Sequence, residues 1–277
     1  MAGKRTMTVH PRISLHQVAF VGDGTPAFVD FCRSHSVPHM TVVTLLMTGR
    51  DDLEIVKAAA AAGGPKAATV NHPFATYPNL PEDSGQAARK LLEAIAATAS
   101  IGAGAIYMQT GGRGKLDWEQ AAGRFTELLA PCKAVARDAG IALMIENASP
   151  FNIDMHIAHT LADTILLADM AGIGVCIDLQ PCWGEAGLPA LFRRAMPITR
   201  LVQVSDYVLG DRSAPCRAVP GDGAMPLERL ITDLLDAGYQ GLFDLELVGP
   251  RINKEGAAAA SLRAIEWLSE HLDKLGA

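Results

Sequence analysis

Four polar side chains stand directly after apolar runs in the second half of the chain, where the interior of a strand would normally exclude them. They are Glu146 after Leu143-Met144-Ile145, Asp178 after Val175-Cys176-Ile177, Gln203 after Leu201-Val202, and Glu246 after Leu245. Burying an unpaired carboxylate is costly or forces it to take up a proton. Three carboxylates on neighbouring strands would repel one another unless a cation lay between them. The pattern therefore predicts a divalent metal ion bound by all four residues, and mostly oxygen ligands favour Mg²⁺ or Mn²⁺.

Two further carboxylates of the same region have more ordinary interpretations. A single carboxylate at a strand end is more often a helix cap or one partner of a salt bridge. Asp206 could orient a metal ligand by contacting that ligand without binding the metal itself. Asp244 is expected on the opposite strand face from Glu246, with a structural role. Four polar residues at the ends of consecutive strands make a chance arrangement the less favoured interpretation of the main set.

The elements that must position these side chains alternate along the chain. Short runs rich in β-forming residues are separated by amphipathic helical stretches, which is typical of βα units and a parallel sheet. The runs lack polar alternation, as expected of strands buried on both faces. Eight strand candidates begin near Ile13, Met40, Ala67, Ala105, Ala142, Gly174, Arg200 and Leu242.

Helix start and stop signals fill the segments between the strands. Asp51 and Asp52 open a helix that stops at Gly63 and Gly64. Asp117 opens another, which ends at Gly140, and Pro226 begins one that ends at Gly238. An acidic start and a glycine end suit the orientation of the helix dipole and the left-handed cap. Each strand is thus predicted to be followed by a helix.

Eight βα units close most simply into one (β/α)₈ TIM barrel, which we expect over residues 1–277, with residues 1–10 as a candidate flexible start. The alternative is an open, doubly wound sheet, which normally shows a glycine-rich phosphate loop after its first strand. Residues 16–24 read HQVAFVGDG and do not fit that motif. In a barrel the carboxyl ends of the strands meet at one mouth, so the four polar side chains would lie together.

Composition excludes several classes of protein. The net charge is −6 with both signs mixed along the chain, whereas a nucleic-acid surface needs clustered Lys and Arg. No apolar run approaches the roughly 20 residues that span a bilayer, and no apolar segment follows Lys4 and Arg5, so we expect no signal peptide. Five scattered cysteines are typical of reduced thiols rather than a zinc cage. We expect a cytoplasmic protein with a small-molecule substrate and neither nucleic acid nor membrane as partner.

The stretch from Leu201 to Ile252 resembles the xylose isomerase-like TIM-barrel superfamily of sugar (phosphate) isomerases and epimerases, and the resemblance extends over most of the chain. It rests on Val202-Gln203-Val204-Ser205-Asp206, Arg217, Pro220-Gly221-Asp222-Gly223, Ala237-Gly238-Tyr239 and Phe243-Asp244-Leu245-Glu246. The resemblance implies Glu, Asp, His and Glu as metal ligands from strands five to eight. Gln203 stands where most members carry histidine, as it does in the hydroxypyruvate-isomerase branch. Pro181 stands where many members carry a histidine that contacts substrate or metal. Either Gln180, Cys182 or Trp183 then forms that wall of the pocket, or the substrate differs from the usual sugars.

The resemblance also implies a mechanism, in which Glu146 and Glu246 bind the metal and move protons. A metal that bridges a carbonyl and an adjacent hydroxyl stabilises the developing enediolate. One glutamate removes the proton alpha to the carbonyl, and the other returns it. Further substrate-binding candidates are His16, His72, Gln109, Trp183 and Arg217, while His156 is expected at the surface or as a cap. Association into a homo-oligomer is an expectation from the relatives.

Other functions of this superfamily stay open. A dehydratase, or a lyase that cleaves a carbon–carbon or C-glycoside bond, would start with the same proton removal. An endonuclease IV-like protein needs a histidine-rich trinuclear zinc site and a basic face, and eight histidines in an acidic chain speak against it. A degenerate barrel that only binds a small molecule or a partner stays open because of Pro181 and Gln203. The presence of Glu146, Asp178 and Glu246 together speaks against that last alternative.

Overall fold

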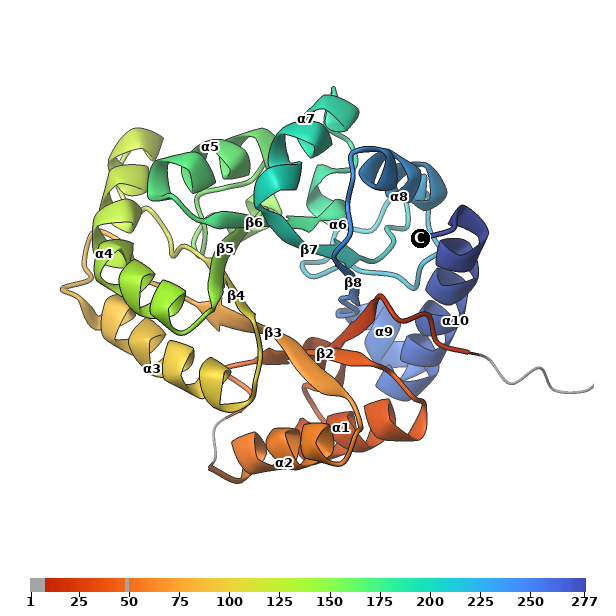
Figure 1. Ribbon diagram of the computed structural model, residues 1–277. Helices are drawn as coiled ribbons and strands as arrows, with labels where there is room; N and C mark the ends of the chain where they lie inside the picture. Colours follow the sequence, from red (N-terminus) through yellow and green to blue (C-terminus); the bar gives the residue numbers. More distant parts are fainter. Residues whose placement is uncertain (1–7, 48–49) are drawn as a thin grey trace, which may run out of the picture.

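The computed structural model describes residues 8–47 and 50–277, and its central feature is a closed barrel of eight parallel strands ringed by helices (Figure 1). The strands follow chain order around the barrel, and β1 closes it by pairing with β8. Their bounds are β1 Ile13–His16, β2 His39–Val43, β3 Lys66–Pro73, β4 Ala105–Gln109, β5 Ala142–Glu146, β6 Gly174–Asp178, β7 Thr199–Val204 and β8 Leu242–Leu245. Every strand begins within one residue of its predicted start, so the (β/α)₈ barrel is confirmed.

Helices cover the outside of the barrel in the order expected from the sequence. The α-helices are α1 Gly24–Ser34, α2 Arg50–Ala61, α3 Gln86–Ser100, α4 Trp118–Asp138, α5 Leu161–Ala171, α6 Leu179–Cys182, α7 Leu188–Ala195, α8 Leu227–Asp236, α9 Pro250–Glu255 and α10 Ala257–Leu275. Short 3₁₀ turns occupy η1 Gln17–Phe20, η2 Pro150–Asn152 and η3 Met196–Ile198. The predicted start of α4 is confirmed by a capping box, in which the Asp117 side chain accepts the Gln120 backbone N–H.

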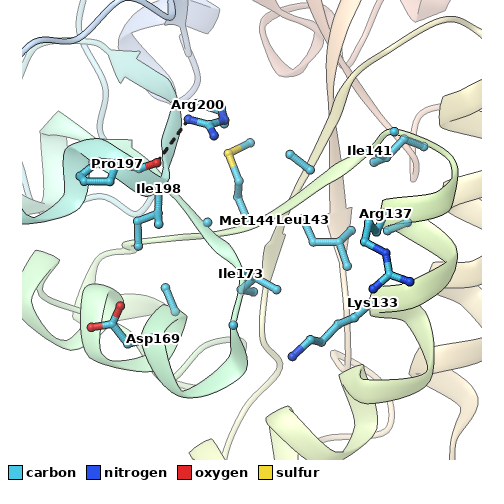
Figure 2. Close-up of a pocket in the computed structure, with 16 residues that line it drawn as sticks. Lys133, Arg137, Ile141, Leu143, Met144, Asp169, Ile173, Pro197, Ile198 and Arg200 are labelled. Carbon is cyan, nitrogen blue, oxygen red and sulfur yellow. Dashed lines mark hydrogen bonds between the residues drawn. The ribbon is translucent and has the colours of Figure 1, made fainter.

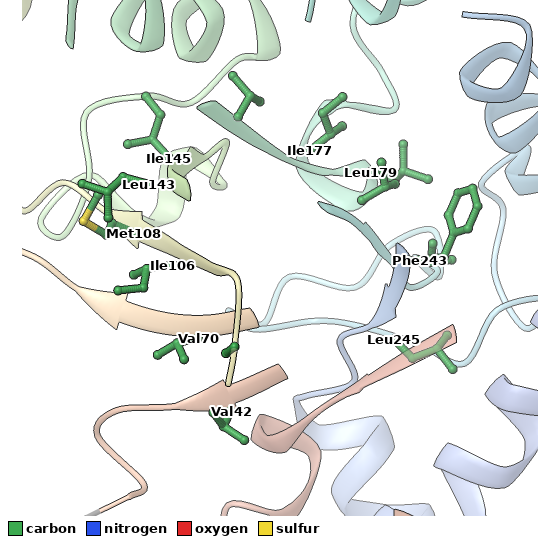
Figure 3. Packing of buried hydrophobic residues seen from close by; sticks show 14 of the residues in the cluster. Val42, Val70, Ile106, Met108, Leu143, Ile145, Ile177, Leu179, Phe243 and Leu245 are labelled. Atoms are coloured by element: carbon green, nitrogen blue, oxygen red, sulfur yellow. The ribbon is translucent and has the colours of Figure 1, made fainter. Parts of the chain in front are cut away.

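The hydrophobic core lies mainly between the strands and the helices. Alternate residues of each strand point outward and pack in one cluster with the apolar sides of the helices, among them Val70, Ile106, Ile145, Ile177 and Leu245 (Figure 3). A smaller cluster fills the barrel interior with the other alternate residues, Ala105, Tyr107, Met144, Cys176 and Leu201. Because side chains alternate with a period of two in a strand, the polar residues on the inward face come together inside the barrel.

Asp244 belongs to this inward face, so its predicted position on the opposite face from Glu246 is wrong. Residues two apart in a strand point to the same side. Asp244 is fully buried, and its Oδ1 accepts a hydrogen bond of 2.8 Å from Thr41 of β2, across the interior. The Thr41 hydroxyl lies 3.3 Å from that of Ser14 in β1. Burial raises the pKa of Asp244, and its role inside the barrel is structural.

A cavity of about 670 Å³ opens at the amino-terminal ends of β5, β6 and β7 (Figure 2). Apolar side chains such as Leu143 and Ile198 form its wall, and Lys133, Arg137 and Arg200 stand around it. Its residues begin these strands, whereas Glu146 and Asp178 end theirs. The cavity therefore lies at the opposite end of the barrel from the predicted metal ligands, at the end where residues mainly support stability.

Two predictions concern the ends of the chain and its relation to membranes. The candidate flexible start over residues 1–10, and the signal-peptide prediction, rest largely on residues 1–7, which lie outside the described part. Among the residues that are described, no helix is both long and apolar enough to cross a membrane.

Candidate active site

Three of the four predicted metal ligands converge at the carboxyl-terminal mouth of the barrel. Glu146 ends β5, Asp178 ends β6, and Glu246 follows β8 by one residue. One oxygen of each carboxylate lies within 4.8 Å of those of the other two. Glu146 and Asp178 are buried, and the side chain of Glu246 is only 13% exposed. The closure of the barrel thus places three acidic groups around one small volume.

Gln203, the fourth predicted ligand, lies inside the barrel next to this cluster. Its Cα is the register partner of that of Asp178, and its side chain is fully buried. The Gln203 Nε2 donates a hydrogen bond of 3.1 Å to the Tyr107 hydroxyl, and Cys176 Sγ lies 3.5 Å from its Oε1. Gln203 does not line the cavity in front of the carboxylates.

Arg217 is the cation that the structure places among the carboxylates. Its Nη1 and Nη2 donate to the two Asp178 oxygens at 3.0 and 2.5 Å, a bidentate arrangement. Nη1 also donates to Ser205 Oγ at 3.0 Å. Nη2 lies 2.9 Å from Glu246 Oε2, which has no directed hydrogen bond, so this contact is an ion pair alone. Burial lowers the pKa of Arg217, but Asp178 and Glu246 outweigh it and hold that pKa well above its usual range.

The charges of the site do not balance. Burial, together with the charges of Glu246 and Asp178, raises the pKa of Glu146 well above its usual range. Burial also raises the pKa of Glu246 to about 7, with Arg217 opposing the shift and Asp178 adding to it. One guanidinium is thus too little positive charge for three carboxylates. The excess of negative charge, carried by hard oxygen donors, fits a divalent cation such as Mg²⁺ or Mn²⁺.

The raised pKa of Glu246 predicts an unusual pH dependence for the metal-free protein. Between about pH 4.5 and pH 7 the native state holds a proton on Glu246 that the unfolded chain releases. The contribution of Glu246 to the free energy of unfolding should therefore rise as the pH falls through this window and be lost as the pH rises through 7. Urea unfolding of the wild-type protein and the Glu246→Gln variant, with chelator, would measure it. Parallel stability curves for the two proteins would contradict the prediction.

A cavity of about 340 Å³ opens in front of the carboxylates, a size within the range of small-molecule sites, roughly 300–1,000 Å³. Gln109 lines it and hydrogen-bonds Glu146. Gln180 and Pro181 form the wall where many relatives carry a histidine, and Phe151 and Met155 add an apolar side. Of the three residues proposed for that wall, Gln180 is the one that lines the cavity.

Three of the predicted substrate-binding residues lie away from this cavity. The ring of His16 contacts the Tyr107 hydroxyl inside the barrel, and burial lowers the pKa of His16 to about 4. His72 Nδ1 lies 3.1 Å from the Thr44 hydroxyl, and burial lowers the pKa of His72 to about 4 as well. Trp183 packs beside Tyr207, with ring centroids 6.5 Å apart. Gln109 and Arg217 are the substrate-binding candidates that the fold brings to the carboxylates.

The sequence did not predict the roles of two residues whose side chains bond the backbone of the site. The Asn147 side chain bridges Asp178, donating to its carbonyl at 2.8 Å and accepting from its N–H at 2.9 Å. The expected surface or capping role of His156 is wrong, because this ring is fully buried. It accepts from the Thr110 N–H at 2.9 Å and contacts the Glu146 carbonyl at 2.7 Å. Asn147 directly follows Glu146, which was the one signal available in the sequence.

Asp206 ties together the long loop that carries Arg217. Its carboxylate accepts four backbone N–H groups, those of Tyr207, Gly221, Gly223 and Met225, at 2.8 to 3.1 Å. Its own backbone pairs with Ala218 in an antiparallel bridge. A Cβ on Gly223 would lie 2.3 Å from Asp206 Oδ1, so only glycine fits there. Asp206 thus acts on the loop backbone, and through it fixes the residue next to Ala218, which is Arg217.

The fold and this constellation agree with comparisons to known proteins. A family model described as the xylose isomerase-like TIM barrel matches residues 37–271. The chain belongs to the xylose isomerase-like TIM-barrel family. Fructoselysine 3-epimerase of Escherichia coli O157:H7 is 25% identical over 134 residues, 48% of each chain. The chain therefore spans about half the length of the curated relatives it matches.

Solved structures of the xylose isomerase-like family superpose over nearly the whole chain. The IolI protein with a bound zinc atom has a TM-score of 0.80 at 14% identity, covering 95% of this chain and 99% of that one. D-psicose 3-epimerase with D-tagatose, from Clostridium cellulolyticum H10, has a TM-score of 0.74 at 14% identity, covering 96% and 98%. At these identities the likeness establishes the fold alone. Family membership and the three carboxylates together identify the mouth of this barrel as the candidate active site.

Proposed function

We propose that the protein is a divalent-metal-dependent epimerase or isomerase of a keto sugar or small hydroxy-carbonyl compound, and that it acts in the cytoplasm. The observation that carries this proposal is the convergence of three carboxylates, two of them buried, with one oxygen of each within 4.8 Å of the others. Glu146, Asp178 and Glu246 would hold the metal, with Gln203 as a fourth ligand. The similarity to a family that includes sugar epimerases supports the reaction class.

The residues of the cavity have the properties that proton transfer alpha to a carbonyl requires. When bound, a divalent cation supplies Lewis-acid polarisation of the substrate carbonyl. Glu146 ends β5 and Glu246 follows β8, and carboxylates held at one substrate cavity can act as a general acid and a general base. One glutamate takes the alpha proton and the other returns a proton to the substrate. Arg217 would offset part of the negative charge of the site, since it pairs with Asp178 and also contacts Glu246.

Metal titration tests the first part of this proposal. About one Mn²⁺ per chain should bind the wild-type protein in calorimetry, and binding should weaken at least 100-fold in Glu146→Gln and Asp178→Asn. Glu228→Gln is a matched control, because that carboxylate pairs with Lys274 on the surface, and it should bind as the wild type does. Absence of Mn²⁺ binding to the wild-type protein would overturn the metal-dependent function and favour a barrel that only binds small molecules.

Proton exchange tests the second part. Keto sugars incubated in D₂O with the Mn²⁺-loaded protein should lose the NMR signal of the proton alpha to the carbonyl, and Glu246→Gln should abolish the loss. Epimers or isomers as products would support the proposed reaction. Loss of water or cleavage of a carbon–carbon bond would instead assign the dehydratase or lyase alternative, which uses the same first step.

A further inference from the structure

Tyr107 forms a hydrogen-bonded hub inside the barrel that the proposed reaction does not use. It lies in β4 and is fully buried. Its hydroxyl oxygen is 2.6 Å from His16 Nε2 of β1 and 3.1 Å from Gln203 Nε2 of β7. Tyr107 does not line the cavity in front of the carboxylates. A phenol in this place joins strands from distant parts of the barrel circumference, and one of its two partners is a predicted metal ligand.

The hydrogen bonds around His16 fix its tautomer and the direction of its bond to Tyr107. The Val18 backbone N–H donates to His16 Nδ1 at 3.0 Å, so Nδ1 carries a lone pair. In a neutral imidazole the proton then sits on Nε2. His16 therefore donates to the Tyr107 oxygen, and this leaves the oxygen with one further lone pair. The Gln203 Nε2–H donates to that second lone pair.

In the structure the oxygen end of the Gln203 amide is turned away from the Tyr107 hydroxyl and toward Cys176. With Nε2 bonded to the phenol, Oε1 faces only Cys176 Sγ, at 3.5 Å, and a thiol is a weak donor. Gln203 lies beside Asp178 in the barrel, and its strand, β7, runs between those that supply Asp178 and Glu246. A hard divalent cation binds the oxygen of an amide and not its N–H₂.

We propose that Tyr107, itself held by His16, is a positioning residue that fixes the Gln203 amide with its oxygen free for the divalent cation. The inference rests on the proposed function, because it needs a metal at the three carboxylates. Without the phenol, the Gln203 N–H₂ would lose its acceptor, and only the weak Cys176 thiol donor would distinguish the two ends of the amide. The Gln203 amide would then have to be reoriented each time a divalent cation binds.

The test is a double-mutant cycle on Mn²⁺ affinity, measured by calorimetry. Tyr107→Phe keeps the ring and removes the hydroxyl. It should raise the Kd for Mn²⁺ about 10-fold, which is the lower end of the usual loss of metal affinity when a residue that orients a metal ligand is mutated. In a Gln203→Ala background the same substitution should change the Kd less than about twofold, because no amide remains to be oriented. The inference would be overturned if Tyr107→Phe weakened Mn²⁺ binding equally in both backgrounds, or if it did not weaken Mn²⁺ binding in the wild-type background.

Two further variants separate positioning from a general effect on the barrel. Tyr239→Phe removes another buried phenol, which bonds the Leu242 carbonyl, and the Kd should stay within about twofold of the wild-type value. If Tyr107→Phe does not fold, His16→Gln keeps the phenol, removes its imidazole donor and permits the same cycle. Wild-type protein that binds no Mn²⁺ overturns the proposed function. Mn²⁺ binding that is insensitive to Tyr107 and His16 overturns only this inference.

Discussion

Replacing Arg217 with methionine should lower the free energy of unfolding of the metal-free protein by about 3–5 kcal/mol, the usual loss when one partner of a buried ion pair is removed. The guanidinium bonds both oxygens of Asp178 and pairs with Glu246. Methionine fills similar space but leaves these carboxylates buried without a counter-charge. Urea unfolding at pH 8, where proton uptake by Glu246 relieves less of the repulsion, gives the clearest measurement.

A metal should partly rescue the Arg217→Met variant. Because a divalent cation supplies the missing positive charge, saturating Mn²⁺ should raise the stability of this variant by more than it raises that of the wild type. Arg263→Met is the matched control, since Arg263 pairs with Asp222 and Glu255 on the surface. The free energy of unfolding of Arg263→Met should fall by about 1 kcal/mol or less. Equal stabilisation of wild type and Arg217→Met by Mn²⁺ would show that the arginine and the metal do not share the same carboxylates.

Replacing Asp206 with alanine should release the loop that carries Arg217. Four backbone N–H groups lose their acceptor at once. A hydrogen bond to a charged group contributes about 1.5–3 kcal/mol. Because the contributions of the four hydrogen bonds are not additive, we expect the free energy of unfolding to fall by about 4 kcal/mol. Limited proteolysis between β7 and α8 should become faster, which reports on the loop directly.

A carboxylate of the same loop serves as the control for this second prediction. Asp211 pairs with Arg251 at the surface and bonds no distant backbone N–H in the way that Asp206 does. Asp211→Ala should leave proteolysis of the loop and Mn²⁺ affinity close to the wild-type values. Cleavage of Asp206→Ala at the rate seen for Asp211→Ala would show that the loop is held by other contacts.

The strands and the carboxylate cluster could be predicted because both follow from local rules. An apolar run of about five residues, buried on both faces, ends where the first charged residue appears, as at Asp178. Chain order then places the ends of successive strands side by side at one mouth. The run itself and the closure of the barrel were enough to place Glu146 and Asp178, whereas the strand before Glu246 already contains a charged residue, Asp244.

The direction of individual side chains and the work of the long loop could not be predicted in the same way. His16 ends β1, yet its ring turns into the barrel because Val18 and Tyr107 are its partners. Asp206 bonds N–H groups up to 19 residues further along the chain. These contacts depend on the path of a loop and on side chains from distant strands. They become visible only when the whole barrel is assembled.

The charged groups of the site, Glu146, Asp178, Arg217 and Glu246, all come from the second half of the barrel, whereas β1 and β2 turn hydroxyl and imidazole groups such as Ser14, Thr41 and His16 inward. The loops after β1 and β3 contribute no residue to the ion pairs between Arg217, Asp178 and Glu246. Changes in those two loops would therefore leave in place both the charged groups and the residues that line the cavity in front of them, all of which lie between Gln109 and Val248.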